Sequence, residues 1–275
     1  MKKKYFALPY IVWMILFTVV PLLLIIVYAL VYTSPTGDVV ITTQYVESAF
    51  ASQNMAVLLR SLWYAVLTTV ICLVLAYPAA LMLSKLKPRT AGILSLLFML
   101  PMWMNFLLRT YAWRALLELN GPINQLIMAL GMPAQKLLYT EGAVIFGLVY
   151  NFFPFMLLPI YTVCSKMNHS YVEAAEDLGA NKAQVLLRVT MPLTRPGVIT
   201  GITMVFMPSV TTFFIPRVLG GGNTQMFGDL IENTFLTAGN WNLGSALSLI
   251  MMVLILISLS ILRKADPNGE GGGIV

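Results

Sequence analysis

Long apolar runs separated by short polar intervals dominate the chain. Each run is about 20 residues or longer, which is the length a helix needs to cross the hydrocarbon core of a bilayer. Backbone groups inside hydrocarbon need partners within the protein, so helices or a closed barrel are the available structures, and continuous runs indicate helices. We predict an all-α membrane protein with six spans, Phe6–Tyr32, Val57–Leu83, Ala91–Leu108, Ala143–Val163, Gly197–Pro216 and Leu243–Leu262.

Composition and charge placement agree with this pattern. The chain is 59% hydrophobic and 10% charged, with a mean hydropathy of +0.82, whereas soluble domains carry roughly 25% charged residues. Of 17 Lys and Arg, 12 fall before span one, between spans two and three, between four and five, or after span six. The positive-inside rule therefore predicts that both termini and the loop 164–196 are cytoplasmic. We expect a transmembrane domain over 1–265, a flexible tail over 266–275, location in the cell inner membrane with lipid around the spans, and no nucleic-acid partner.

The loop between spans four and five is polar and contains helix signals. Ser170 followed by Glu173 predicts a capping box at the start of a short helix. Gly179 is a natural stop in left-handed geometry. Asn181 is expected to cap a second short helix over Lys182–Thr190 that ends near Pro192. An ordinary amphipathic connector is the alternative interpretation of the same pattern.

A longer motif runs through this loop. Glu173-Ala174-Ala175, three residues, Gly179, nine residues, and then Val189-Thr190-Met191-Pro192 resembles the signature of binding-protein-dependent ABC importer permeases, whose consensus has Ile and Leu at the Val189 and Met191 positions. The resemblance implies a type I ABC importer permease (MetI-like) fold. It also implies that Glu173, Ala174, Ala175, Gly179 and Pro192 form the contact with a separate ATPase subunit. No Gly-x4-Gly-Lys motif occurs, so we expect no cofactor in this chain and ATP on the partner.

Two further stretches carry a narrower resemblance. Pro101–Tyr111, and Ile215–Gly221 with Gln225–Ile231 and Asn240-Trp241, are similar to the B-type permeases of spermidine/putrescine importers. That resemblance implies a second permease subunit, two copies of an ATP-binding subunit, an extracytoplasmic solute-binding protein and a polyamine substrate. Ferric-ion, thiamine and opine permeases share the architecture and remain alternatives.

A polyamine path needs carboxylates, carbonyls or aromatic faces, because a buried unpaired ammonium is prohibitively costly. The predicted spans contain no interior acid. Candidates for the path are therefore aromatic, and candidates for an acidic outer mouth are two carboxylates that lie three apart on one helical face. These residues are Trp103, Tyr111, Tyr150, Phe213 and Phe214, and Asp229 and Glu232. The alternatives are core or interfacial packing for the aromatics and a solvated loop or binding-protein contact for the acids.

Other function classes are less well supported. A secondary transporter working alone usually has internal repeats or ionisable residues within its spans, and neither is evident here. A single histidine, His169, excludes a His-Glu-x-x-His metalloprotease, and Cys72 and Cys164 lack metal or disulfide spacing. We predict no catalytic residue and no metal site. The outer segment Arg109–Gly131 is expected to form two short helices broken at Gly121-Pro122, with Arg109 and Arg114 pairing with Glu118 or contacting the binding protein.

Overall fold

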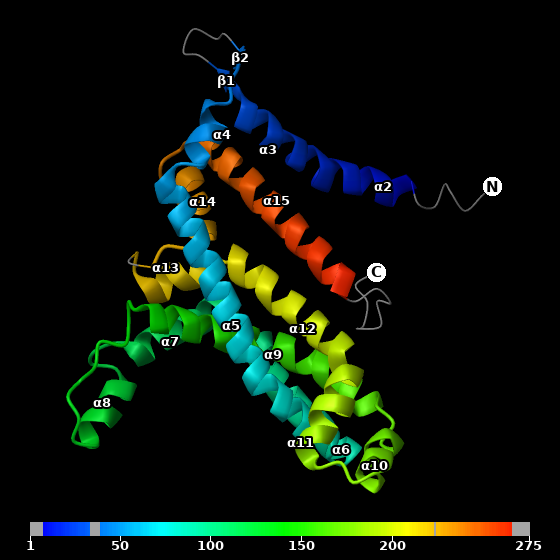
Figure 1. Ribbon diagram of the computed structural model, residues 1–275. Coiled ribbons are helices and arrows are strands. Elements are labelled where there is room, and N and C mark those ends of the chain that lie inside the picture. Colours follow the sequence, from blue (N-terminus) through cyan, green and yellow to red (C-terminus); the bar gives the residue numbers. More distant parts are fainter. Residues whose placement is uncertain (1–7, 34–38, 223, 266–275) are drawn as a thin grey trace.

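The computed structural model describes residues 8–33, 39–222 and 224–265, and this part of the chain is mostly helical (Figure 1). The predicted tail 266–275 and the basic residues Lys2, Lys3 and Lys4 lie outside the described residues. In chain order the elements are α2 (Leu8–Met14), the π-helix η1 (Ile15–Val19), α3 (Val20–Leu30), β1 (Val31–Thr33), β2 (Val39–Ile41), α4 (Gln44–Ala49), α5 (Ser52–Ser84), α6 (Pro88–Trp103), α7 (Phe106–Leu117) and α8 (Pro122–Ala129). They continue with α9 (Glu141–Lys166), α10 (Ser170–Asp177), α11 (Lys182–Val185), the π-helix η2 (Leu186–Thr190), α12 (Met191–Thr211), α13 (Phe214–Gly220), α14 (Phe227–Leu236) and α15 (Trp241–Ala265).

Four stretches of the described chain form helices that are long and apolar enough to cross a membrane. They are Pro9–Leu30, Ser52–Ser84, Glu141–Lys166 and Trp241–Leu262. These helices correspond to predicted spans one, two, four and six. The number rises to six only if each of two bent helix pairs counts as one span.

The third and fifth predicted spans are not straight helices. The chain bends by 90° between Pro88–Trp103 and Phe106–Ala129, the segment that contains α7 and α8, and by 64° between Lys182–Thr211 and Phe214–Gly220. At the first break Met104 is extended, and the Asn105 side chain accepts hydrogen bonds from the backbone of Leu107 at 2.9 Å and Leu108 at 3.2 Å. Those bonds satisfy amides at the start of α7, so a new helix begins inside the apolar run. The predicted continuous helices Ala91–Leu108 and Gly197–Pro216 are therefore wrong at their C-terminal ends.

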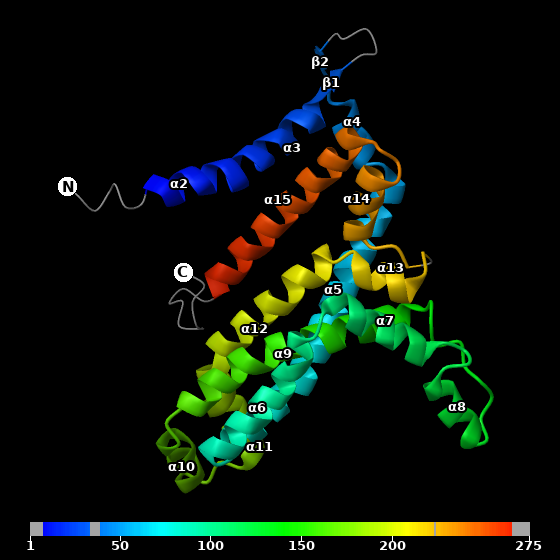
Figure 2. The ribbon, with the colours of Figure 1, turned by 180° about the vertical axis from the view of Figure 1, so that it is seen from behind.

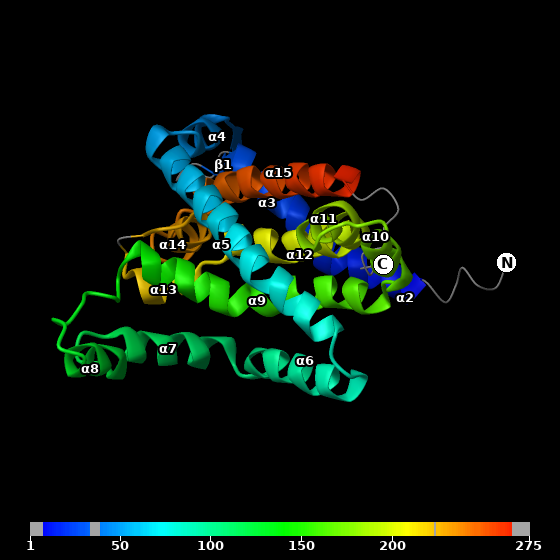
Figure 3. The ribbon, with the colours of Figure 1, turned by 60° about the horizontal axis from the view of Figure 1, so that its bottom comes forward.

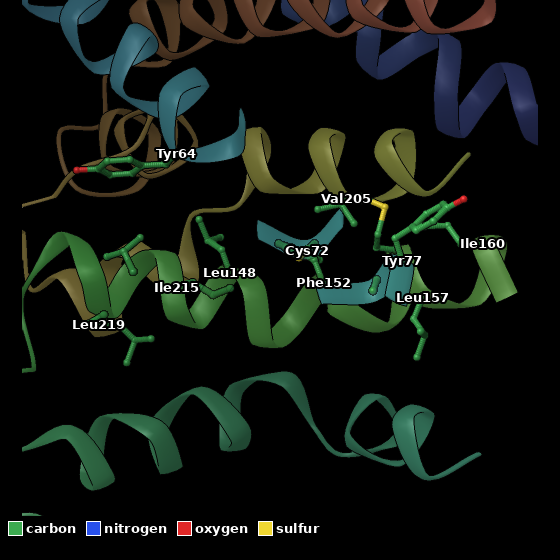
Figure 4. Packing of buried hydrophobic residues seen from close by; sticks show 14 of the residues in the cluster. Tyr64, Cys72, Tyr77, Leu148, Phe152, Leu157, Ile160, Val205, Ile215 and Leu219 are labelled. Atoms are coloured by element: carbon green, nitrogen blue, oxygen red, sulfur yellow. The ribbon is translucent and has the colours of Figure 1, made fainter. Parts of the chain in front are cut away.

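The main core lies where α5, α9 and α12 pack together (Figure 4). Gly197 and Gly201 permit close contact between α12 and α9, because a Cβ at Gly197 would lie 2.8 Å from the Pro159 carbonyl oxygen. Small residues allow such helix approach in membranes. The hydroxyls of Tyr77 on α5 and Thr194 on α12 are 2.9 Å apart and buried. This hydrogen bond joins α5 directly to α12.

The N-terminal helices stand apart from that core. Among Pro9–Leu30 only Ala29 is buried, and α3 packs mainly against α15 (Figure 2). After α3 the chain forms the antiparallel pair β1–β2, with Tyr32 opposite Val40. The all-α prediction did not include this hairpin, whose strands are three residues each.

The outer segment folds as two short helices, as predicted. α7 and α8 follow α6 along one edge of the molecule, beside α9 (Figure 3). The Asn124 side chain holds the loop after α8 through the Gln135 amide at 2.8 Å and the Gln135 carbonyl at 2.9 Å. In the same view the start of α2, the end of α15 and α10 lie toward one end of the molecule, and α8 and α13 toward the other.

Candidate coupling surface and transport path

The predicted coupling residues form an exposed projection at one end of the molecule (Figure 1). Glu173 and Ala174 on α10 are exposed, as are Gly179 and Pro192, and Ala175 is half-buried. Leu178, at the end of α10, leaves 89% of its surface accessible. α10 packs only against the short helical segments α11 and η2 among the contacts described for it. This geometry leaves a small, partly apolar surface open to another protein.

The turn that follows α10 is specified by its hydrogen bonds. The Ala180 amide donates to the Ala175 carbonyl at 3.0 Å, and the Gly179 amide donates to the Glu176 carbonyl at 2.9 Å. Together with the φ of +83° at Gly179, this is a Schellman motif, which ends a helix in left-handed geometry. The predicted helix stop at Gly179 is confirmed.

The predicted capping box at Ser170 is wrong. Ser170 is the first residue of α10, and its amide donates to the Asn168 side-chain oxygen at 3.1 Å. Asn168 therefore satisfies an amide at the helix start that Ser170 was expected to serve. A complete capping box occurs instead at the next helix, where the Asn181 side chain and the Gln184 amide, and the Gln184 side chain and the Asn181 amide, each bond at 2.9 Å.

The second short helix does not end near Pro192. Helical structure runs without a break from Lys182 to Thr211 through the π-helix η2. Pro192 lies in the first turn of α12, where a missing amide donor is tolerated because η2 relaxes the hydrogen-bond pattern just before it. The exposed projection is thus joined to the α12 span by a continuous helix rather than by a flexible loop.

The two predicted outer acids lie on α14 in different environments. One guanidinium nitrogen of Arg217 donates to both carboxylate oxygens of Glu232 at 2.6 Å, so Arg217 compensates the charge of Glu232. Asp229 is buried and accepts from the Asn233 amide nitrogen at 3.2 Å. Burial, and then the nearby Glu232 carboxylate, raise the pKa of Asp229 above its ordinary value.

The predicted aromatic residues are only partly brought together. Tyr111 and Phe214 meet edge to face with centroids 5.7 Å apart, and Phe214 also lies 5.7 Å from Phe106. Tyr150 packs against Trp113 at 5.0 Å. Tyr111 is nevertheless exposed, at 49%. Trp103 and Phe213 are exposed at 75% and 44%, and no ring contact is described for either.

The sequence pattern did not indicate the residue that links these aromatic groups. Arg109 on α7 is buried, with 7% of its surface accessible. Its guanidinium donates to the Pro101 carbonyl and to the Asn151 side-chain oxygen. Its central carbon lies 5.7 Å from the Tyr150 ring centroid and 6.0 Å from that of Phe106.

Of the two alternatives for Arg109 and Arg114, pairing with Glu118 or contact with the binding protein, the first holds for Arg114. Arg114 lies 3.9 Å from Glu118. In the described part of the chain, no carboxylate forms an ion pair with Arg109. The signal that points to Arg109 is Asn151, a lone amide in the middle of the apolar run that forms α9.

A cleft of about 660 Å³ lies between α9 and α12 and reaches the start of α10. Its α9 side is formed by Phe155, Leu158, Pro159, Thr162 and Lys166. Asn168 and Tyr171 line the end near the coupling projection. Of the aromatic and acidic candidates named above, none lines this cleft.

Comparison with known proteins identifies the family. A profile described as "Binding-protein-dependent transport system inner membrane component" matches residues 4–268. The chain belongs to this family. It is the permease subunit of an ABC importer, with transport permeases rather than enzymes as its relatives.

Individual relatives narrow the comparison. The permease is 35% identical over 258 residues to the spermidine/putrescine transport system permease protein PotB of Haemophilus influenzae, covering 92% of this chain and 90% of that protein. It is 34% identical over 265 residues to PotB of Escherichia coli strain K12, covering 92% and 94%. The permease is thus closely related to the PotB proteins, as the motifs around Pro101 and Pro216 indicated.

Solved structures of lower identity share the fold. A bacterial alginate ABC transporter, crystallised in complex with an alginate pentasaccharide-bound periplasmic protein, matches with a TM-score of 0.79 at 15% identity, covering 98% of this chain and 96% of that chain. The methionine transporter MetNI, in an inward-facing conformation, matches with a TM-score of 0.51 at 17% identity, covering 79% and 100%. The ABC importer permease fold predicted from the coupling motif is therefore confirmed.

Proposed function

We propose that this permease imports spermidine or putrescine, as one of two permease subunits driven by two copies of an ATPase and supplied by an extracytoplasmic solute-binding protein. The observation that carries the substrate class is the 34–35% identity to PotB proteins over 92% of the chain. The ATPase, the second permease and the binding protein follow from what importers of this family require. ATP is bound by the partner, and this chain supplies no cofactor.

Both termini and the α10 projection face the cytoplasm in this proposal. The segments that carry the basic residues before α6, at the end of α9, and through α11, η2 and the start of α12 lie toward the end that carries α10 (Figure 3), which supports that orientation. Glu173, Ala174 and Gly179 then contact the ATPase directly. Because Lys182–Thr211 is continuous, movement of the projection would be passed to α12 as movement of one lever.

The acidic mouth for a cation rests on Asp229 more than on Glu232. Arg217 compensates Glu232, whereas no cationic side chain among the described residues forms an ion pair with Asp229. A substrate ammonium near Asp229 would favour its charged form, which burial disfavours. Spermidine uptake by the Asp229→Asn variant tests this role, and unchanged rate and affinity would remove Asp229 from the path.

Reconstitution of the complete importer tests the function as a whole. Proteoliposomes with this permease, its partner permease, the ATPase and the binding protein should accumulate radiolabelled spermidine or putrescine only with ATP. ATP-driven uptake of ferric ion, thiamine or an opine instead of a polyamine would replace the substrate class. Uptake without ATP would refute the ABC importer mechanism.

A further inference from the structure

Arg109 lies in the first turn of α7, just after the break that follows α6, and the groups described around its guanidinium are neutral. Its two terminal nitrogens bind the Pro101 carbonyl and the Asn151 amide oxygen, and two aromatic faces lie beside its central carbon. The remaining nitrogen, Nε, is buried without a hydrogen-bond partner in the structure. The environment thus offers a cation carbonyl and amide oxygens and two π faces, and leaves one of its donors unsatisfied.

A purely structural bridge would not need this charge. Burying an unpaired cation is costly, and a neutral amide could join the same two oxygens at a smaller desolvation cost. The oxygens and aromatic faces around Arg109 are the groups that a substrate ammonium would need in a path without carboxylates. The side chain of Arg109 fills a place that suits a cation.

The position of this cluster relative to the cleft gives it a role. Asn151 precedes Phe155 by four residues on α9, and the cleft then follows the same face through Leu158 and Thr162 to Lys166. On α6, Met102 lines the cleft and is the neighbour of Pro101. Arg109 therefore lies one helical turn beyond the end of the cleft that is farther from α10.

We propose that the Pro101 carbonyl, the Asn151 amide oxygen and the faces of Phe106 and Tyr150 form a binding site for one ammonium group of the substrate, which Arg109 occupies when no substrate is present. The inference rests on the proposed import of a polyamine. Arg109 is a tethered competitor at this site. Its fixed charge also opposes leakage of other cations through the empty path, as a buried arginine does in some channels.

The first test is equilibrium binding of radiolabelled spermidine to the purified complex of both permeases and the ATPase, without the binding protein. If Arg109 fills the site about nine-tenths of the time, the apparent affinity is about tenfold below the intrinsic affinity. The Arg109→Ala variant, which has no side-chain donor for either oxygen, should therefore bind spermidine about tenfold more tightly, and Arg109→Lys, which keeps a tethered cation, should not gain. Arg114→Ala, on the same helix but half-buried and paired with Glu118, is the matched control and should bind as the wild type does. An assembled Arg109→Ala complex with wild-type affinity would overturn the inference.

A second measurement uses the unaltered complex, so it does not depend on a variant that folds. Phenylglyoxal modifies accessible guanidinium groups, and peptide mass spectrometry reports the adduct at each arginine. Saturating spermidine should raise the modification rate of Arg109, because the substrate displaces it, and leave that of Arg114 unchanged. An Arg109 rate that is unaffected by spermidine means that the side chain is a static bridge and refutes the proposal.

These experiments distinguish failure of the proposed substrate from failure of the ammonium site. A wild-type importer that neither binds nor accumulates a polyamine refutes the proposed substrate, and the ammonium site with it. A wild-type importer that accumulates spermidine, but whose Arg109 neither competes nor moves, refutes the ammonium site alone.

Discussion

Replacing Gly179 with valine tests the turn that links the two halves of the coupling projection. The φ of Gly179 is +83°, and a Cβ there would meet no atom within 4 Å. The cost of a side chain is therefore backbone strain alone, about 1–2 kcal/mol for an L-residue in left-handed geometry, and larger for a β-branched one. That energy disfavours the Schellman turn by about five- to thirtyfold relative to other geometries.

We expect the Gly179→Val importer to assemble, but with ATP hydrolysis poorly coupled to substrate uptake. In proteoliposomes, the Gly179→Val complex should hydrolyse ATP but accumulate several-fold less substrate for each ATP, because α10 no longer holds a fixed direction relative to α11. Gly179→Asn should be milder, since asparagine tolerates left-handed geometry.

Gly131 provides a matched control. Its φ is +81°, it also has no atom within 4 Å of a built Cβ, and it lies after α8 at the other end of the molecule. Gly131→Val imposes the same local strain and should keep wild-type coupling. If both variants couple normally, or if both lose transport to the same extent, the lever argument fails.

Three further predictions, one with a control variant, test other parts of the structure. Glu173→Lys reverses an exposed charge on α10 and should abolish co-purification of the ATPase while membrane insertion is retained; normal ATPase recovery would contradict the assigned contact. Gly197→Leu should lower the melting temperature and the yield of the complex, because its Cβ would lie 2.8 Å from the Pro159 carbonyl and 3.1 Å from the Ile160 Cα, an overpacking worth about 1–3 kcal/mol or more. Gly92→Leu, with no atom within 4 Å, should be harmless in the same melting experiment. Asp229 has a raised pKa in the folded state, so its contribution to stability is present below the ordinary value of 3.8 and is lost as pH rises through the raised value. Asp229→Asn should thus melt at a higher temperature than the wild type at neutral pH, and the difference should vanish in acid; a constant difference across this range would rule out titration as its cause.

The straight spans were predictable because continuous apolar runs decide them. Each of α5, α9 and α15 extends a few residues beyond its predicted limits. Polar residues such as Ser52 and Glu141 continue the helix there. The breaks in spans three and five were not predictable from hydropathy. A single side chain, Asn105, accepts the amides that begin α7, and apolar residues continue on both sides of it.

The coupling projection shows the same division. Gly179 marked its stop correctly because a left-handed turn has a strong residue preference. Ser170 misled because Asn168, two residues earlier, offers a competing oxygen. The role of Arg109 depends on Asn151, a partner 42 residues away, and charge counting along the chain assigned this arginine to the outer surface.

A cysteine at Ala174 gives the most direct test of the central claim, that the exposed α10 projection binds the ATPase on the inner face. The native Cys72 and Cys164 are buried, with 0% and 1% accessible, so a thiol introduced at the exposed Ala174 reports its own position. A membrane-impermeant maleimide should fail to label Ala174→Cys from outside intact cells, label it in inside-out vesicles stripped of the ATPase, and be blocked when the ATPase is restored. Leu130 follows α8 and its side chain is exposed, so Leu130→Cys should be labelled from outside. Labelling of Ala174→Cys in intact cells, or in inside-out vesicles regardless of bound ATPase, would contradict the account.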